Sequence, residues 1–298
     1  MKKKKLIKAG AARKSFLVFN AIICGLIALM CVAPVIHVFA VSFSSRVAVD
    51  SEIVYLWPVN FTLDSYRYMI RDGQFLRSYV VTIERSALAW LLTTVNLVLM
   101  AYPLSLPKTR FPARSFFSWY FIITMLFSGG IVPTYLVVKE TGLIDTFWAL
   151  IIPSIVPVFD TILMMNFMKS LPASITEAAY IDGAGHIRTL LKIVLPLCLP
   201  ALASISLFII LWNWNDYFSG MVYIRNQSLK PLQTYLRSII LVNDGVLDSA
   251  DLDSIRANLS SDATNGAKIF LGLLPIMVLY PFLQKYFAKG IVRGSVKE

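Results

Sequence analysis

The residues of this chain that could carry out chemistry are few, and none is arranged for catalysis. The two histidines, His37 and His186, have no cysteine or second histidine beside them, so no metal-ligand spacing occurs. The three cysteines fall in apolar runs, where a thiol behaves as a small apolar group. No phosphate-binding loop, dinucleotide fingerprint or nucleophile elbow is present. The sequence therefore predicts no catalytic residue, no metal site and no cofactor held by this chain.

The polar stretch over residues 177–196 reads EAAYIDGAGHIRTLLKIVLP and lies between two strongly apolar segments. Ser174 and Glu177 have the spacing of a capping box, which predicts the start of a helix. The residues DGAG at 182–185 then predict a turn, because glycine adopts left-handed backbone geometry at little cost. After His186, apolar residues recur at i, i+3, i+4 and i+7, which predicts a second short helix. The small alanine and glycine residues of the whole stretch suit the docking of another protein. An amphipathic loop among lipid headgroups is the alternative.

The elements that must position this stretch are long and apolar. Hydrophobic residues make up 57% of the 298 residues and charged residues 15%, whereas a soluble domain carries roughly a quarter charged residues. Apolar runs of about 20 residues, enough to cross a ~30 Å hydrocarbon core, recur along the chain. We predict an all-α polytopic membrane protein with six spans, at residues 16–43, 78–104, 116–138, 147–168, 197–223 and 267–287.

The basic residues between the spans predict the orientation. The basic start resembles that of a signal peptide, but its apolar run is far longer than a signal core of roughly 7–15 residues, so we expect a retained first span. With the amino terminus inside, the predicted cytoplasmic segments hold 17 Lys and Arg and the outer segments hold nine. The positive-inside bias therefore places both termini in the cytoplasm. The formal charge of +11 follows from this bias and requires no nucleic-acid partner.

These assignments give a predicted domain order. It runs from a basic cytoplasmic tail over residues 1–15 through a first span over 16–43, an extracellular segment over 44–77 and a transmembrane core over 78–289 to a cytoplasmic tail over 290–298. Within the core, residues 172–196 are predicted to form a cytoplasmic loop and residues 224–266 an extracellular loop. Aspartates between 248 and 253 lack the spacing of an EF-hand, so a solvated loop is expected there rather than a calcium site.

Several short motifs carry a family resemblance. The spacing E-A-A-x3-G-x9-I-x-L-P is formed by Glu177, Ala178, Ala179, Gly183, Ile193, Leu195 and Pro196, and Asp182 precedes the glycine. It resembles the EAA motif of bacterial ABC-importer permeases, in the version of the carbohydrate-uptake group. The stretches WPVNFTLDSY at 57–66, WNWND at 212–216 and FAKGIVRGSVK at 287–297 resemble second permeases of the maltose type, although Glu298 replaces the final glycine of the tail. MLFSGGIVPTY at 125–135 is similar to the subgroup for oligosaccharides or polysaccharide fragments.

The resemblance implies a type I importer permease in the bacterial cell membrane, surrounded by lipid. Its implied partners are a second permease that completes a heterodimer, two ATPase subunits, an extracellular solute-binding protein and a sugar substrate. ATP and Mg would be bound by the partner ATPase, and residues 172–196 would hold the coupling helix. Glu177 would either face an arginine of the ATPase or cap its own helix. A permease for a non-sugar solute and a membrane scaffold that docks a non-transport partner are the alternatives.

Four residues near the end of the fifth predicted span form a candidate substrate path. Asn213, Asp216 and Tyr217 are predicted to share one helical face, with Trp212 beside them. Aromatic rings together with amide and carboxylate acceptors suit a sugar, whose ring faces are apolar and whose edges carry hydroxyl groups. An aromatic belt at the membrane interface is the alternative interpretation.

Other candidates lie within predicted spans, where ionisable residues are costly. Asp160 is expected either to line the path or to hydrogen-bond to a neighbouring helix. Gly129 and Gly130 predict a break in the third span, which either lines a cavity or permits close packing. Glu84 and Arg85, near the outer end of the second span, are expected to extend to the membrane interface.

Overall fold

The computed structural model describes residues 11–71, 73–243 and 262–295, and the regular secondary structure among them is entirely helical. This confirms the all-α prediction. The chain divides into two compact units, residues 1–71 with 249–271 and residues 72–248 with 272–298. The boundary between them falls within the last helix, α14 (Asp262–Ser295). The predicted aspartate cluster over 248–253 lies outside the described residues.

The first unit contains α1 (Ala11–Ser42), α2 (Arg46–Asp50), α3 (Asp64–Arg71) and the start of α14. An aromatic cluster gathers around Phe43, whose ring stacks on Phe61 at 5.4 Å and lies 4.8 Å from the ring of Tyr66. The Thr62 hydroxyl accepts a hydrogen bond of 3.2 Å from the Asp64 backbone N–H, at the start of α3. These contacts join the end of α1 to the segment that leads into α3.

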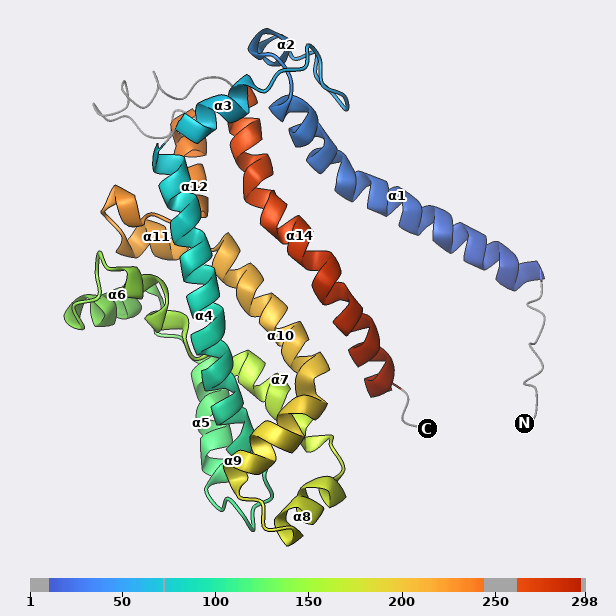
Figure 1. Ribbon diagram of the computed structural model, residues 1–298, viewed down its shortest axis with the longest axis vertical. Coiled ribbons are helices and arrows are strands. Elements are labelled where there is room, and N and C mark those ends of the chain that lie inside the picture. Colours follow the sequence, from blue (N-terminus) through green and yellow to red (C-terminus); the bar gives the residue numbers. More distant parts are fainter. Residues whose placement is uncertain (1–10, 72, 244–261, 296–298) are drawn as a thin grey trace. The chain divides into compact units, whose positions relative to one another are not determined.

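The second unit is built around α4 (Gly73–Ser105), α7 (Val158–Lys169) and α10 (Leu195–Asn215), which pack on one another because each carries an apolar face. Leu97, Ala101, Met164 and Cys198 are completely buried between these helices. The shorter helices of this unit are α5 (Arg114–Leu126), α6 (Ile131–Glu140), α8 (Ala173–Ile181), α9 (His186–Thr189), α11 (Phe218–Tyr223) and α12 (Leu232–Asn243). Figure 1 shows α8 and α9 at one end of this unit, α11 and α12 toward its other end, and α4 reaching both.

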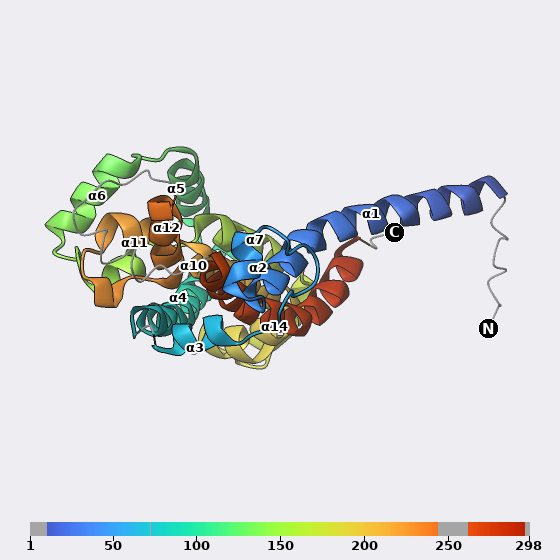
Figure 2. The same ribbon diagram turned by 90° about the horizontal axis from the view of Figure 1, so that it is seen from above.

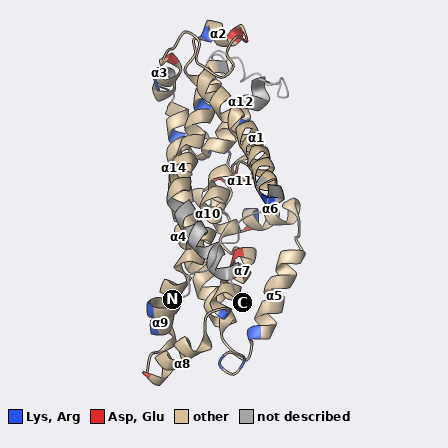
Figure 3. Ribbon diagram, turned by 90° about the vertical axis from the view of Figure 1, so that its right-hand side faces the viewer, with Lys and Arg blue, Asp and Glu red and all other residues tan. Residues whose placement is uncertain are grey.

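Among the residues that the structure describes, four helical runs are long and apolar enough to cross a membrane, namely Ser15–Ser42, Gly73–Ser105, His186–Asn215 and Ala263–Pro281. The number rises to six if each of two bent helix pairs counts as one span. Charged residues lie mainly near the helix ends and in the loops, and α10 carries none (Figure 3). Within the described residues, the helices agree with the six predicted spans if each bent pair counts as one span. Two of the six spans are then bent.

The third and fourth predicted spans are not straight helices. α5 and α6 meet at a bend of 113°, because Gly130 adopts φ +84°, a conformation that favours glycine. Figure 2 shows α6 at the outer edge of the unit, with α11 between it and α4. In the fourth span, two short 3-10 turns, η1 (Phe147–Leu150) and η2 (Ile152–Ser154), meet α7 at 47°. Pro153 and Pro157 account for this second break, because proline has no N–H to donate within a helix.

The prediction for the fifth span was wrong at both ends. Residues 197–223 were expected, but the helical run extends from His186 to Asn215. It begins early because the second arm of the polar stretch continues directly into the span through the π-helical turn η3 (Leu190–Val194). It ends early because Asp216 is extended, with ψ 106°, and α11 starts anew after it.

Candidate functional site

The polar stretch forms the predicted helix–turn–helix, with α8 as its first arm and α9 as its second. Gly183 lies between them at φ +77°, so the prediction of left-handed geometry at this residue is confirmed. The Gly183 N–H donates to the Tyr180 carbonyl at 3.0 Å, and the Ala184 N–H donates to the Ala179 carbonyl at 2.9 Å. These two bonds close the carboxyl end of α8 and turn the chain toward α9.

The predicted capping box is absent from the described structure. α8 begins at Ala173, one residue before Ser174, and no side chain caps it. The physical reason is that Pro172 fixes the backbone ahead of the helix, so Ser174 already lies inside the first turn. Glu177 is exposed and does not serve as the reciprocal cap.

The other predicted coupling residues are divided between the surface and the interior. Ala178 and Asp182 are exposed, whereas Ala179 is buried against the rest of the unit. Farther along, Ile193 and Leu195 are half-buried and Pro196 is exposed. The Leu195 N–H bonds to the Leu190 carbonyl across the π-helical turn that precedes Pro196.

Tyr180 joins both arms of the helix–turn–helix to a third segment. Its hydroxyl lies 3.1 Å from the hydroxyl of Tyr102 on α4 and 3.1 Å from Nδ1 of His186 on α9. The guanidinium carbon of Arg110 lies 3.5 Å from the centre of the Tyr180 ring. No local pattern in the sequence indicates a role for His186 or for either tyrosine, because the contact between Tyr102 and Tyr180 joins residues far apart in the chain.

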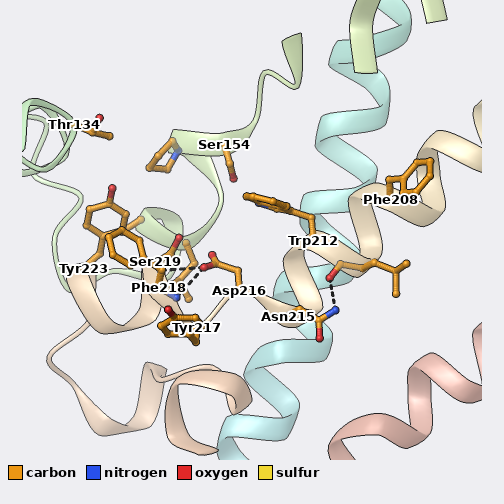
Figure 4. A pocket seen from close by; sticks show the side chains of 14 residues that line it. Thr134, Ser154, Phe208, Trp212, Asn215, Asp216, Tyr217, Phe218, Ser219 and Tyr223 are labelled. Atoms are coloured by element: carbon orange, nitrogen blue, oxygen red, sulfur yellow. Dashed lines mark hydrogen bonds between the residues drawn. The ribbon is translucent and has the colours of Figure 1, made fainter. Parts of the chain in front are cut away.

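A cavity of about 780 Å³ opens beside the carboxyl end of α10. Its lining is mainly aromatic and aliphatic, with a few polar side chains and one carboxylate, and comprises Thr134, Ala149, Leu150, Pro153, Ser154, Phe208, Leu211, Trp212, Asn215, Asp216, Tyr217, Phe218, Ser219 and Tyr223. Figure 4 shows the Trp212 side chain extending from α10 toward Ser154. Because 70% of Trp212 is exposed, its ring face is free to contact a solute.

The structure brings together three of the predicted path residues. Trp212, Asp216 and Tyr217 line the cavity, but the helical face predicted for Asn213, Asp216 and Tyr217 does not form because α10 ends at Asn215. Asn213 is buried, and its side-chain amide donates to the Ile209 carbonyl at 2.9 Å instead of facing the cavity. Trp214 is likewise internal, since its indole N–H donates to the Gly272 carbonyl at 3.0 Å.

The remaining candidates do not line this cavity. Asp160 is half-buried in the first turn of α7. Gly129 and Gly130 form the break between α5 and α6, and only the nearby Thr134 reaches the lining. The break therefore places α6 at the cavity without contributing a glycine to its wall.

Arg85 is the main correction to the sequence analysis. It does not extend to the membrane interface, because it is 1% exposed and forms an ion pair with Asp216 through Nη2 and Oδ2. Its Nη1 donates to the Asp216 backbone carbonyl at 3.2 Å. Glu84, the neighbouring residue, is exposed. Opposite charges in two separate predicted spans were the available signal for this pair, because ionisable residues in spans usually pair with one another.

The second carboxylate oxygen of Asp216 is also occupied. Oδ1 accepts hydrogen bonds from the backbone N–H groups of Phe218 at 2.9 Å and Ser219 at 3.1 Å (Figure 4). This is the arrangement of a helix N-cap, and it holds the first turn of α11. Asp216 therefore connects α4 to α11, and its carboxylate has little hydrogen-bonding capacity left for a solute.

Asp145 holds the segment that follows α11. Its Oδ1 accepts hydrogen bonds from the backbone N–H groups of Asn226 at 2.8 Å and Arg225 at 2.9 Å. Those two bonds lower the pKa of the Asp145 carboxyl below its ordinary value. The Asp145 N–H donates to the carbonyl of Tyr223, whose side chain lines the cavity.

Together these features define a polytopic helical membrane protein with a helix–turn–helix between two spans and an aromatic-lined cavity. Residues 80–293 match the family described as the inner membrane component of binding-protein-dependent transport systems, and the chain belongs to this family. The match covers both the helix–turn–helix and the cavity residues. The predicted resemblance to importer permeases and the predicted location in the cell membrane are confirmed.

Known relatives agree over almost the full length. The chain is 38% identical over 270 residues to the polygalacturonan/rhamnogalacturonan transport system permease protein YtcP of Bacillus subtilis (strain 168), covering 91% of this chain and 94% of the relative. It is 37% identical to Protein LplC of the same organism, covering 96% of each chain. Among solved structures, it is similar to a chain of a bacterial ABC transporter involved in the import of the acidic polysaccharide alginate, with a TM-score of 0.84 and 32% identity, covering 95% of this chain and 100% of that chain.

Proposed function

We propose that this chain is a permease subunit of an ATP-driven importer for oligosaccharides or polysaccharide fragments, with both termini in the cytoplasm. The observation that carries the proposal is the helix–turn–helix of α8 and α9, whose Gly183 turn and residue spacing fit a coupling loop. Relatives named for polygalacturonan, rhamnogalacturonan and alginate support a saccharide substrate. ATP and Mg are bound by a separate ATPase subunit, and this chain supplies part of the path.

The exposed tip of the helix–turn–helix supports the docking of another protein. Ile181 is 87% exposed and Ile187 is 75% exposed, and they lie on either side of the Gly183 turn. Burying such side chains contributes about 25 cal/mol for each Å² removed from water, which favours an apolar cleft in a partner. Exposed Glu177 and Asp182 add two carboxylates on the same loop, and cationic groups of the ATPase would pair with them.

The cavity beside α10 supports a role in binding the saccharide. Its exposed Trp212 ring offers an apolar surface on which a sugar ring face can stack. The Thr134 hydroxyl donates to the Gly130 carbonyl and the Ser154 hydroxyl to the Ile151 carbonyl, so each hydroxyl of the lining keeps its capacity to accept a hydrogen bond. Such a lining suits uncharged ring faces and hydroxyl groups.

The partners follow from the same proposal. A second permease completes the translocation path as a heterodimer, two ATPase subunits dock at the coupling loops, and an extracellular solute-binding protein delivers the saccharide. The outer segment over residues 224–266 would meet that binding protein. The positive-inside bias of the sequence supports this orientation.

The test is Gly183→Val, with Gly185→Val as its matched control. Neither glycine has an atom within 4 Å of an added Cβ, so there is open space at the first side-chain atom of both substitutions. Only Gly183 has a positive φ, whereas Gly185 has φ −70°, so only Gly183→Val strains the backbone, by about 1–3 kcal/mol.

The measurement is made on the purified complex in liposomes, with labelled oligogalacturonides as the transport probe. We expect Gly183→Val to remove solute-stimulated ATP hydrolysis and uptake, while Gly185→Val retains both. Normal coupling in the Gly183→Val complex would contradict the proposal. Failure of an ATPase to co-purify with the wild-type chain would favour a scaffold, and coupled uptake of a different solute would favour a non-sugar importer.

A further inference from the structure

Tyr180 links four segments of the second unit through one side chain. Its hydroxyl lies 3.1 Å from both the Tyr102 hydroxyl and His186 Nδ1, so the three groups form a continuous hydrogen-bonded chain. The guanidinium group of Arg110 lies over the Tyr180 ring, with 3.5 Å between its central carbon and the ring centre. A cation over an aromatic face at this distance is attracted by the ring quadrupole. Tyr180 is thus held through both its hydroxyl and its ring.

The partners of Tyr180 have different positions in the fold. His186 is the first residue of α9, so its bond to Tyr180 ties the two arms of the helix–turn–helix together. Tyr102 is buried near the end of α4, and Arg110 lies in the connection between α4 and α5. In the described part of the chain, the tyrosine pair is the side-chain hydrogen bond that connects α8 with α4.

The chain connection from the helix–turn–helix into α10 is irregular. Between α9 and α10 the chain passes through the π-helical turn Leu190–Val194, in which the hydrogen-bonding pattern widens from i+4 to i+5. Pro196 follows directly and has no N–H to donate. The route from α9 into α10 therefore contains an irregular turn, whereas α4 is helical from Gly73 to Ser105 and has its one proline, Pro103, in the last turn after Tyr102.

α4 also contacts the cavity wall and the outer segment. Arg85 precedes Tyr102 by 17 residues, which is about 26 Å along a helix that rises 1.5 Å per residue. At that level Arg85 binds Asp216, which lines the cavity and caps α11. One turn earlier, the Thr82 hydroxyl accepts a hydrogen bond of 2.7 Å from the Leu232 N–H, at the start of α12. The same helix therefore connects the helix–turn–helix with two elements at the opposite end of the unit.

We propose that Tyr180 and Tyr102 are a positioning pair through which displacement of the helix–turn–helix moves α4, and that α4 carries this movement through Arg85 to Asp216 in the cavity wall. The inference rests on the proposed function, in which an ATPase docks on the helix–turn–helix. It adds a second route for coupling besides the chain connection through Pro196. Neither tyrosine touches the saccharide or ATP in this proposal.

The test removes single hydroxyl groups. Tyr180→Phe and Tyr102→Phe each delete one partner of the hydrogen bond but keep the ring, so the packing and the Arg110 contact are retained. Tyr120→Phe on α5 is the matched control, because that tyrosine is exposed and its hydroxyl makes no hydrogen bond in the described structure. The measurements on the reconstituted complex are ATPase co-purification, ATP hydrolysis and the number of oligogalacturonides imported per ATP.

We expect either Tyr→Phe variant to lower import per ATP by about 2- to 30-fold, the range of couplings altered by residues remote from the ligand sites. ATPase co-purification and basal hydrolysis stay at the wild-type level. The double variant loses no more than Tyr180→Phe alone, because Tyr180→Phe already deletes the bond that Tyr102→Phe deletes, together with the bond to His186. Tyr120→Phe remains normal.

A second measurement follows the movement of α4 without any saccharide. Spin labels at positions 80 on α4 and 132 on α6, in a chain with its three cysteines replaced, report the distance between these helices before and after trapping with ATP and vanadate. We expect a distance change in the wild-type background that becomes smaller in Tyr180→Phe. An unchanged response in Tyr180→Phe would overturn the proposal, and so would equal losses of ATPase docking, hydrolysis and import. If Gly183→Val uncouples the complex while both tyrosine variants remain normal, the proposed function stands and the role of the tyrosine pair is wrong.

Discussion

The helix–turn–helix of α8 and α9 and the cavity beside α10 are built in different ways. The first is local: α8, the Gly183 turn and α9 occupy one short stretch, and the tip is exposed. The second is assembled from α6, the η1–η2 segment, α10 and α11, with a charge from α4 behind its wall. The loop therefore depends on the backbone geometry at Gly183, whereas the cavity wall depends on the buried ion pair between Arg85 and Asp216. The two regions should therefore fail in different ways when they are altered.

The largest effect is expected from Asp216→Ala. It leaves the Arg85 guanidinium buried without its partner, and breaking a buried pair in this way costs roughly 3–5 kcal/mol. It also removes the cap of α11, worth about 1 kcal/mol. We expect a lower melting temperature in detergent and a lower yield of folded protein, whereas Gly183→Val, with its strain of about 1–3 kcal/mol, should lower the melting temperature less. The measurement is the thermal unfolding of both purified variants.

The control for this prediction removes both charges. Arg85→Met combined with Asp216→Leu leaves no unpaired charge, so most of the lost stability should return, apart from the contribution of the helix cap. Asp216→Asn keeps an oxygen that can accept from the N–H groups of α11 but loses the charge, so its melting temperature should lie between those of wild type and Asp216→Ala. A double variant as unstable as Asp216→Ala would show that the pair does not hold the cavity wall.

The contrast between the two regions also explains what could be predicted from sequence. Gly183 was identified as a left-handed turn because its neighbours in the chain sufficed. Asp216 lies in the cavity lining, but its partner Arg85 was assigned to the interface, because 131 residues separate the two and no local signal records their pairing. The end of the fifth span at Asn215 was not predicted for the same reason, because Asp216 ends α10 only through contacts formed in the folded protein.

A smaller effect is expected from Trp212→Ala. The ring is 70% exposed and lines the cavity, so its removal should leave the melting temperature unchanged. If a sugar ring stacks on it, the KM for uptake should rise about 10-fold, equivalent to about 1.4 kcal/mol of lost binding. Trp212→Phe should give an intermediate value. The matched control is Trp119→Ala on α5, which is 65% exposed and lies outside the cavity lining. Equal, normal kinetics in both alanine variants would favour the aromatic-belt interpretation of Trp212.

The smallest effect is expected at Asp145, which holds the segment after α11 from an exposed position. Its pKa is lowered in the folded protein by hydrogen bonds from Asn226 and Arg225, so the ionised form stabilises the fold. That contribution is fully present above the pKa of an unfolded aspartate and is lost as the pH falls through the lower, folded value. Asp145→Ala should therefore melt slightly below wild type at neutral pH, and the difference should shrink under acidic conditions. Asp145→Asn keeps the acceptor oxygen and tolerates the positive φ of 62° at this position, so it should lie closer to wild type at neutral pH, and its difference from Asp145→Ala should not change with pH. A difference between wild type and Asp145→Ala that stays constant with pH would mean that the ionised carboxylate does not hold this segment, and that Tyr223 is kept at the cavity by its backbone bond to residue 145 alone.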